Sequence, residues 1–281
     1  MITETQLKEK LREIDFTQFA SIEGVDMDLL LGEMIFHIGS VDGQLRDNLI
    51  YSSFYRLIEH NALSSPQMLL LLDTCMDENH LFLGIGSRDD TVFTRAFSSL
   101  VLALLLRKNR TQSFLPPEKV HQAISACFHY LEREEDTRGY VEGKGWAHSI
   151  AHGADLLEQV IRHPAFSPAL HVTALAVIEN CLLKDTAYMD EEDGRLFYAI
   201  EALLDRGMEI DVLYRWLSGL KKEISERFIE QGYSNPFYRT KLNIENFYKT
   251  CYFRLKWRGT GEEICAFIEK LLEKWHNHDY N

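Results

Sequence analysis

The segment Ala147-His-Ser-Ile-Ala-His-Gly-Ala-Asp-Leu-Leu-Glu-Gln-Val-Ile161 repeats apolar residues at three- and four-residue spacing, which predicts an amphipathic α-helix. On a helical wheel its apolar residues share one face, about 120° wide. These residues are Ala147, Ile150, Ala151, Ala154, Leu157 and Ile161. The same period recurs along the chain, and no alternating, β-branched segment of convincing length interrupts it. The sequence therefore predicts an all-α fold.

Several expected helices have recognisable starts. Ser65-Pro66, Ser167-Pro168 and Asn235-Pro236 each fit an N-cap residue followed by proline at the first helical position, where the missing N–H is harmless. After short helices near residues 7–14 and 26–38, the expected helices cover about 44–60, 66–78, 90–108, 117–134, 145–162, 168–183, 191–206, 211–231, 236–256 and 260–278.

The spacing of these helices predicts how they are arranged. A helix recurs about every 20–25 residues, so a helix pair repeats at roughly 40–47 residues, which is typical of HEAT or armadillo arrays. No Ser/Gly-rich linker divides the chain. We expect residues 1–281 to form a single α-α superhelix of antiparallel helix pairs, with a concave surface for a ligand. Because no crisp internal repeat is visible, a generic helical array is the open alternative.

Composition and charge limit the classes of partner. The chain has 281 residues, of which 46% are hydrophobic and 26% charged, and a formal net charge of −13. An acidic surface repels phosphate backbones, so we expect no nucleic-acid partner. The longest apolar run, Leu100 to Leu106, is far shorter than the roughly 20 residues of a membrane span. The five cysteines form no C-x-x-C pair and the N-terminus lacks a signal peptide, so we expect reduced thiols and a cytoplasmic protein.

Three polar residues in the helix of the opening segment suggest a binding strip. His148, His152 and Asp155 are spaced by four and three residues and so project from the same side of a helix. Two imidazoles and a carboxylate suit a divalent metal ion. The pattern is His-x-x-x-His, however, and Ser149 and Ile150 stand where a zincin carries its general base. The alternative is that each histidine bonds to a packed neighbour and fixes the helix register.

A glycine-rich loop precedes this helix. Its three glycines surround Glu142 and Lys144, directly before Trp146. Glycine permits positive φ and a close backbone approach, so the loop can form a tight turn, and the helix N-terminus behind it favours anions. The pattern is not that of a P-loop. The alternative is an interhelical turn whose Arg138 and Glu142 pair with neighbouring helices.

A second cluster lies at Arg88-Asp-Asp-Thr-Val-Phe-Thr-Arg95. Asp89 or Asp90 is expected to cap the helix that follows, with Thr91 as a further option. Arg88 and Arg95 could bind an anion, and the aspartates could supply oxygen ligands to a metal. Capping and ion pairing are the favoured interpretation of this cluster.

Three segments carry a family resemblance. Arg138-Gly-Tyr-Val-Glu-Gly-Lys-Gly-Trp-Ala-His-Ser-Ile-Ala-His-Gly-Ala-Asp-Leu-Leu157, Asp89-Asp-Thr-Val-Phe-Thr-Arg-Ala-Phe-Ser98 and Glu192-Asp-Gly-Arg-Leu-Phe-Tyr-Ala-Ile200 resemble an uncharacterised bacterial family, the domain of unknown function 2785. The resemblance covers most of the chain. It implies a soluble, largely helical protein without an assigned reaction, and it supplies no catalytic residues.

Three functional hypotheses follow. The leading one is a non-catalytic binding or scaffold protein with a polar groove for an unknown protein or small-molecule ligand. The groove residues would be Arg88, Asp89, Asp90, Arg95, Arg138, Glu142, Lys144, Trp146, His148, His152 and Asp155. The alternative is a metal-dependent hydrolase, in which the His/His/Asp strip holds the ion and Glu142, Asp89 or Asp90 acts as base toward an activated water. The third is a purely structural role for the motif.

Overall fold

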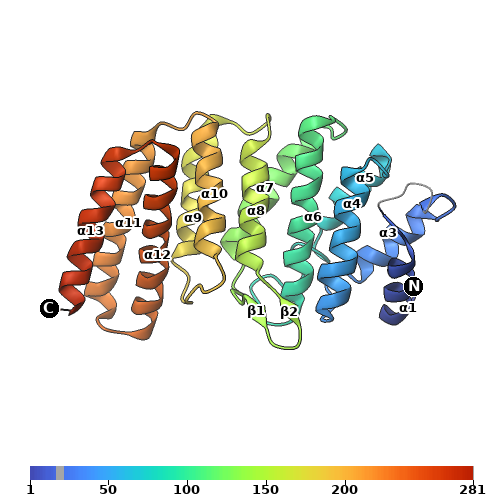
Figure 1. The fold of residues 1–281 in the computed structure, drawn as a ribbon, viewed down its shortest axis with the longest axis horizontal. Helices are drawn as coiled ribbons and strands as arrows, with labels where there is room; N and C mark the ends of the chain where they lie inside the picture. The colour runs from blue at the N-terminus through green and yellow to red at the C-terminus, as the bar shows by residue number, and fades with distance from the viewer. Residues whose placement is uncertain (17–21, 281) are drawn as a thin grey trace. The chain divides into compact units, whose positions relative to one another are not determined.

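The protein is almost entirely helical. The computed structural model describes residues 1–16 and 22–280, with side chains up to residue 277, and in this part of the chain the only strands form one short hairpin (Figure 1). The chain divides into two compact units, Met1–Phe166 and Ser167–Asn281. Helices pack in pairs within each unit, which confirms the predicted all-α fold. A single continuous superhelix over both units stays a prediction.

Unit 1 is organised around one long helix. The elements of this unit are α1 (Glu4–Glu13), α3 (Met27–Phe36), the π-helix η1 (Gln44–Tyr51), α4 (Ser52–Glu59), α5 (Ser65–Cys75), α6 (Thr91–Thr111), α7 (Pro117–Arg133), β1 (Tyr140–Val141), β2 (Gly145–Trp146) and α8 (Ser149–Arg162). Helix α6 packs against α4, α5, α7 and α8 (Figure 1). The apolar run Leu100 to Leu106 lies within α6 and is buried, which explains why this helix is apolar on nearly all sides.

Unit 2 has a central helix of its own. Its elements are the 3-10 turn η2 (Pro168–Leu170), α9 (His171–Leu182), α10 (Glu192–Asp205), α11 (Ile210–Gln231), α12 (Asn235–Arg258) and α13 (Glu262–Tyr280). Helix α12 packs against α9, α10, α11 and α13. Phe247 of α12 makes ring contacts with Phe197 and Trp216, so aromatic side chains from three helices meet in the core of the unit.

The helix starts lie close to the predicted positions, with a shift at two of the three prolines. Ser64, not Ser65, caps α5: its hydroxyl accepts from Gln67 N, and the Gln67 side chain completes a capping box. Likewise Ser234, not Asn235, caps α12. Proline then occupies the second helical position, where its missing N–H is equally harmless. Ser167 caps its turn as predicted.

The structure also addresses two further sequence predictions, that the cysteines are free thiols and that no segment is long and apolar enough to span a membrane. All five cysteines are free, and four of them are buried, as expected for reduced thiols. Burial raises the pKa of Cys75 above its ordinary value, which favours the protonated thiol. No helix in the described residues combines the length and the apolar character that crossing a membrane requires.

Two helical glycines provide a test of the packing of α8 on α7. A Cβ at Gly153 would lie 2.5 Å from Leu131 Cδ2 and 3.0 Å from Tyr130 Cε1, whereas a Cβ at Gly219 of α11 would meet no atom within 4 Å. We expect Gly153→Ala to lower the free energy of unfolding by about 1–2 kcal/mol, because overpacking outweighs the gain in helix propensity. The control Gly219→Ala should raise it by about 0.5–1 kcal/mol. Urea denaturation measures both, and equal effects would contradict a tight α7–α8 contact.

Candidate functional site

The glycine-rich loop forms a β-hairpin between α7 and α8. Its two strands are antiparallel and pair Tyr140 with Trp146 and Val141 with Gly145. Gly143 and Gly145 have φ values of 73° and 77°, which side chains with a Cβ rarely adopt. A Cβ on Gly145 would also lie 3.1 Å from the guanidinium of Arg46. The helix predicted to begin near residue 145 therefore begins at Ser149, because the preceding residues are held in the hairpin.

His148 lies at the N-cap of α8 and not inside the helix. Its backbone is left-handed, with φ 53° and ψ 34°, so the helical spacing that links it to His152 and Asp155 does not fully apply. The two imidazole rings nevertheless lie close together, with centroids 5.4 Å apart. Asp155 follows within α8 and is half-buried.

The positions of these side chains bear on the metal hypothesis. Among the described residues, no group of three or more His, Cys, Asp or Glu side chains is arranged so that it could hold a metal ion. The His148, His152 and Asp155 set therefore gains no support as a metal site. A metal at this strip stays a prediction.

Aromatic rings form a continuous row from the hairpin to the core. Trp146 lies edge-on to Tyr140 across the hairpin and stacks on His148, with a centroid distance of 4.8 Å and an interplanar angle of 23°. The row continues through His152 to Phe97 of α6. At its outer end Tyr140 is 55% exposed and Trp146 is 39% exposed. Tyr140 is not among the residues that the sequence singles out, because its contact with Trp146 arises from the hairpin and the sequence predicts only a tight turn here.

Ion pairs tie the hairpin to the start of α6. Lys144 Nζ contacts the carboxylate of Asp90, and Arg138 lies 3.6 Å from the same carboxylate. Arg138 also donates to the backbone oxygen of Asp89 (2.7 Å) and to Asp136 Oδ2 (2.6 Å). The predicted pairing of Arg138 is thus found at Asp90, the residue before α6, whereas Glu142, for which the same pairing is predicted, forms no ion pair with any described residue. Glu142 lies exposed at the hairpin turn, and Arg88 is an exposed residue 3.7 Å from Glu135.

Asp89 performs the capping role predicted for one of the two aspartates. Its Oδ1 accepts a hydrogen bond from Thr91 N (2.9 Å) and one from the Thr91 hydroxyl. These bonds hold the pKa of the Asp89 carboxyl below its ordinary value. Asp90 is the formal N-cap residue of α6, but its side chain makes no capping bond and is used in the ion pairs to the hairpin.

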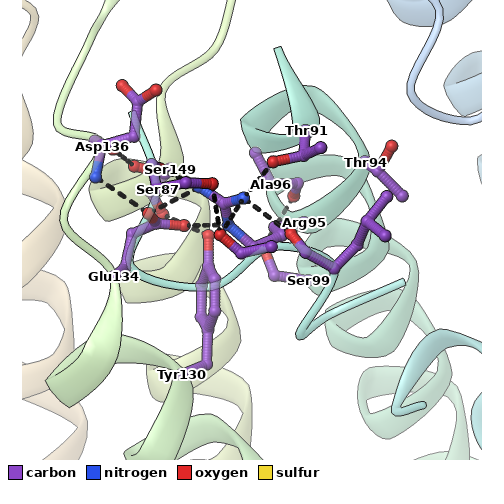
Figure 2. Close-up of polar contacts among 12 residues, drawn as sticks. Ser87, Thr91, Thr94, Arg95, Ala96, Ser99, Tyr130, Glu134, Asp136 and Ser149 are labelled. Atoms are coloured by element: carbon purple, nitrogen blue, oxygen red, sulfur yellow. Dashed lines mark hydrogen bonds and ion pairs between the residues drawn. The ribbon is translucent and has the colours of Figure 1, made fainter. Parts of the chain in front are cut away.

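Arg95 is a buried structural residue. Its side chain is fully buried, and Figure 2 shows it directed toward Glu134 at the end of α7. Nε donates to Glu134 Oε2 (2.6 Å), and Nη2 donates to Glu134 Oε1 (2.8 Å). Nη1 donates to the backbone oxygen of Leu83 (2.8 Å) and to the Thr91 hydroxyl (2.7 Å). Burial alone would lower the pKa of Arg95, but the hydrogen bonds and charge of Glu134 raise it, so the guanidinium stays charged. Arg95 therefore lies beneath the site and is not exposed in a groove.

The Arg95–Glu134 pair extends to the base of the hairpin. Glu134 Oε1 also accepts from Asp136 N (2.9 Å), and Asp136 holds Arg138 as described above. The Ser149 hydroxyl donates to the backbone oxygen of Asp136, which connects the same segment to the first residue of α8 (Figure 2). The strand entering the hairpin and the helix leaving it are thus held by one network.

Arg46 of η1 supports the hairpin from another side. It is fully buried, and its guanidinium lies over the rings of Phe93 (4.2 Å) and Phe97 (4.8 Å). Nη2 donates to the backbone oxygens of Lys144 (2.8 Å) and Trp146 (3.1 Å). Burial lowers the pKa of Arg46, and the adjacent carboxylate of Asp47 opposes this effect. The sequence does not identify Arg46, because no local pattern distinguishes it from a surface arginine.

Comparison with known proteins identifies the family of this chain but gives no function for it. The model of the family described as Protein of unknown function (DUF2785) matches residues 81–253, a span that contains the hairpin and both ends of the Arg95–Glu134 pair. No curated protein and no solved structure gives a significant match.

Breaking the buried ion pair should destabilise the protein strongly. Glu134→Gln keeps the side-chain shape but leaves the Arg95 guanidinium buried without a counter-charge, so we expect a loss of about 3–5 kcal/mol in the free energy of unfolding. The control Arg88→Ala removes an exposed contact and should change stability by less than about 0.5 kcal/mol. Chemical denaturation of both variants provides the measurement. A Glu134→Gln variant as stable as the control would show that the pair does not hold the segment.

The left-handed backbone of His148 gives a second prediction. His148→Gly and His148→Ala delete the same imidazole contacts, but only glycine adopts this backbone conformation without steric cost. We expect the glycine variant to be more stable than the alanine variant by about 1 kcal/mol, measured by thermal and urea denaturation. The reverse order would mean that the chain at residue 148 is not left-handed.

Proposed function

This chain belongs to the DUF2785 family of proteins of unknown function, and we propose that it is a non-catalytic binding protein that recognises a protein partner through its hairpin. The hairpin surface is the patch formed by the side chains of Tyr140, Glu142, Lys144 and Trp146. The observation that carries the proposal is the pair of exposed aromatic rings, Tyr140 and Trp146, on a hairpin that buried arginines hold in place.

Exposed aromatic side chains on a fixed support are suited to binding. Tyr and Trp are enriched among the residues that contribute most to protein–protein affinity, and they lose little conformational entropy on binding. Here the two rings already contact each other at a centroid distance of 5.1 Å, and Trp146 is further stacked on His148. A partner would therefore meet side chains that are largely pre-ordered, which lowers the entropic cost of association.

The charges of the surface favour a protein partner. Lys144 and Arg138 are already paired with Asp90, so the patch presents mixed, locally compensated charge beside the rings. With a net charge of −13, the chain offers no basic excess for a phosphate backbone. A partner with an apolar pocket for Tyr140 or Trp146 and a polar rim fits this chemistry.

The metal-dependent hydrolase is not advanced as a second function. Of the three candidate bases, Asp89 and Asp90 are used in a helix cap and in ion pairs, and Glu142 is exposed at the hairpin turn. No cluster of metal-ligating side chains occurs within residues 1–16 and 22–277. Elemental analysis of untagged protein can still decide this point. One equivalent of metal that is lost in a folded His148→Ala/His152→Ala variant would favour the hydrolase.

The binding proposal is tested by removing the two rings. Partners cross-linked to wild-type protein in an extract of the source organism are identified by mass spectrometry and then measured individually. For a direct partner, Tyr140→Ala/Trp146→Ala should weaken binding by roughly 30-fold or more, equivalent to about 2 kcal/mol. The control Phe36→Ala removes a ring that is 56% exposed on α3 of the same unit and should leave affinity unchanged. Full retention of every partner by the double variant would disprove the proposal.

A further inference from the structure

A second surface lies in unit 2, between α11 and α13. A groove of about 510 Å³ runs between these helices, and three lysines stand in its walls, namely Lys221 of α11 and Lys270 and Lys274 of α13. Its apolar floor contains Tyr214, Phe267 and Leu271. We call this feature the α11–α13 groove. None of its residues belongs to the hairpin surface.

The α13 side of the groove is one continuous helix face. Residues 263, 267, 270 and 274 line it at spacings of four, three and four, which places them on the same side of the helix. The eleven steps from residue 263 to residue 274, at about 1.5 Å rise each, give a face roughly 16 Å long, or about three helical turns. The groove is therefore long enough to hold about three turns of another helix.

The lysines of the groove differ from two other exposed lysines in the same unit. Lys222 on α11 pairs with Glu226, and Lys249 on α12 pairs with Glu245. In contrast, Lys221, Lys270 and Lys274 form no ion pair with any described residue. The chain has 43 acidic and 30 basic residues, so a surface with more positive than negative charge contrasts with the chain as a whole. The groove wall sets these three lysines against one acidic residue, Glu263, which leaves an excess of two positive charges.

The floor of the groove is apolar and anchored to the core. Tyr214 and Phe267 are in ring contact at a centroid distance of 5.5 Å, and Phe267 also contacts the buried Tyr248 of α12. Leu271 is buried, whereas Tyr214 remains partly exposed. The surface therefore combines a fixed apolar strip with positive charge along its edges.

We propose that the α11–α13 groove docks an amphipathic helix of a protein partner, with apolar residues on the floor and acidic residues beside the lysines. Charge complementarity carries the choice of occupant, because the groove sets three lysines against one glutamate on an otherwise acidic chain. Its length and apolar floor match recognition of a helix through anchors at i, i+3, i+4 and i+7. A second copy of this chain is disfavoured, because each copy carries a net charge of −13.

Fluorescence anisotropy with a synthetic helix tests this proposal on the full chain. The probe is a fluorescein-labelled 16-residue peptide with leucine at three- and four-residue spacing and glutamate at the flanking positions. We expect saturable binding that weakens as salt rises, and Lys270→Glu/Lys274→Glu should weaken it by roughly tenfold or more. The control Lys222→Glu/Lys249→Glu makes the same change of charge outside the groove, on α11 and α12, and should change the affinity by less than about twofold. A peptide with lysine in place of glutamate should not bind.

Three outcomes would overturn the proposal. The first is no saturable binding of the glutamate peptide at concentrations up to about 1 mM, which corresponds to a binding free energy weaker than about −4 kcal/mol. The second is equal binding to wild type and to Lys270→Glu/Lys274→Glu. The third is concentration-dependent dimerisation of the wild type, in sedimentation, that the same variant abolishes, since the occupant would then be a second copy. Unchanged circular dichroism and urea midpoints establish that the variants, which alter exposed side chains, are folded.

Discussion

The buried ion pair between Arg95 and Glu134 is the interaction on which the hairpin depends. Both side chains are fully buried, so either charge alone would carry a large desolvation cost, and each requires the other. The remaining donors of Arg95 bind backbone oxygens and the Thr91 hydroxyl, and Glu134 also accepts from Asp136 N. The pair therefore joins the start of α6 to the end of α7 and sets the direction in which the chain leaves α7 toward the hairpin.

A second buried arginine completes the support. Arg46 reaches the hairpin from η1, binds the backbone oxygens of Lys144 and Trp146, and packs its guanidinium on two rings of α6. Guanidinium groups suit this position, because they donate in several directions and stack on aromatic faces. Glycine at residue 145 leaves the room that this contact needs. Two arginines from different helices thus hold a short hairpin that has only two residues in each strand.

The two proposed surfaces differ in chemistry. On the hairpin surface Lys144 is paired with Asp90, and the exposed aromatic rings are what a partner would contact. In the α11–α13 groove the apolar floor is anchored to the core, and the distinguishing feature is the three lysines, which form no ion pair with any described residue. Each lies in a separate compact unit, so one chain could engage two different partners, or two segments of one partner, with independent requirements.

The sequence by itself determined the helices of this protein, and tertiary packing decided the site. Helical period and caps are local properties, so the all-α fold and the helix bounds followed from the residues, with errors of one or a few positions, as at Ser64 and Ser149. The same spacing placed His148 inside a helix, but hairpin geometry holds its backbone left-handed. The sequence shows that Arg95 is charged and lies near the start of a helix. It does not show that Arg95 pairs with Glu134, because the two residues are 39 positions apart. The burial of Arg46 and the exposure of Tyr140 likewise depend on which helices pack together, and a single sequence does not encode such contacts in any local pattern.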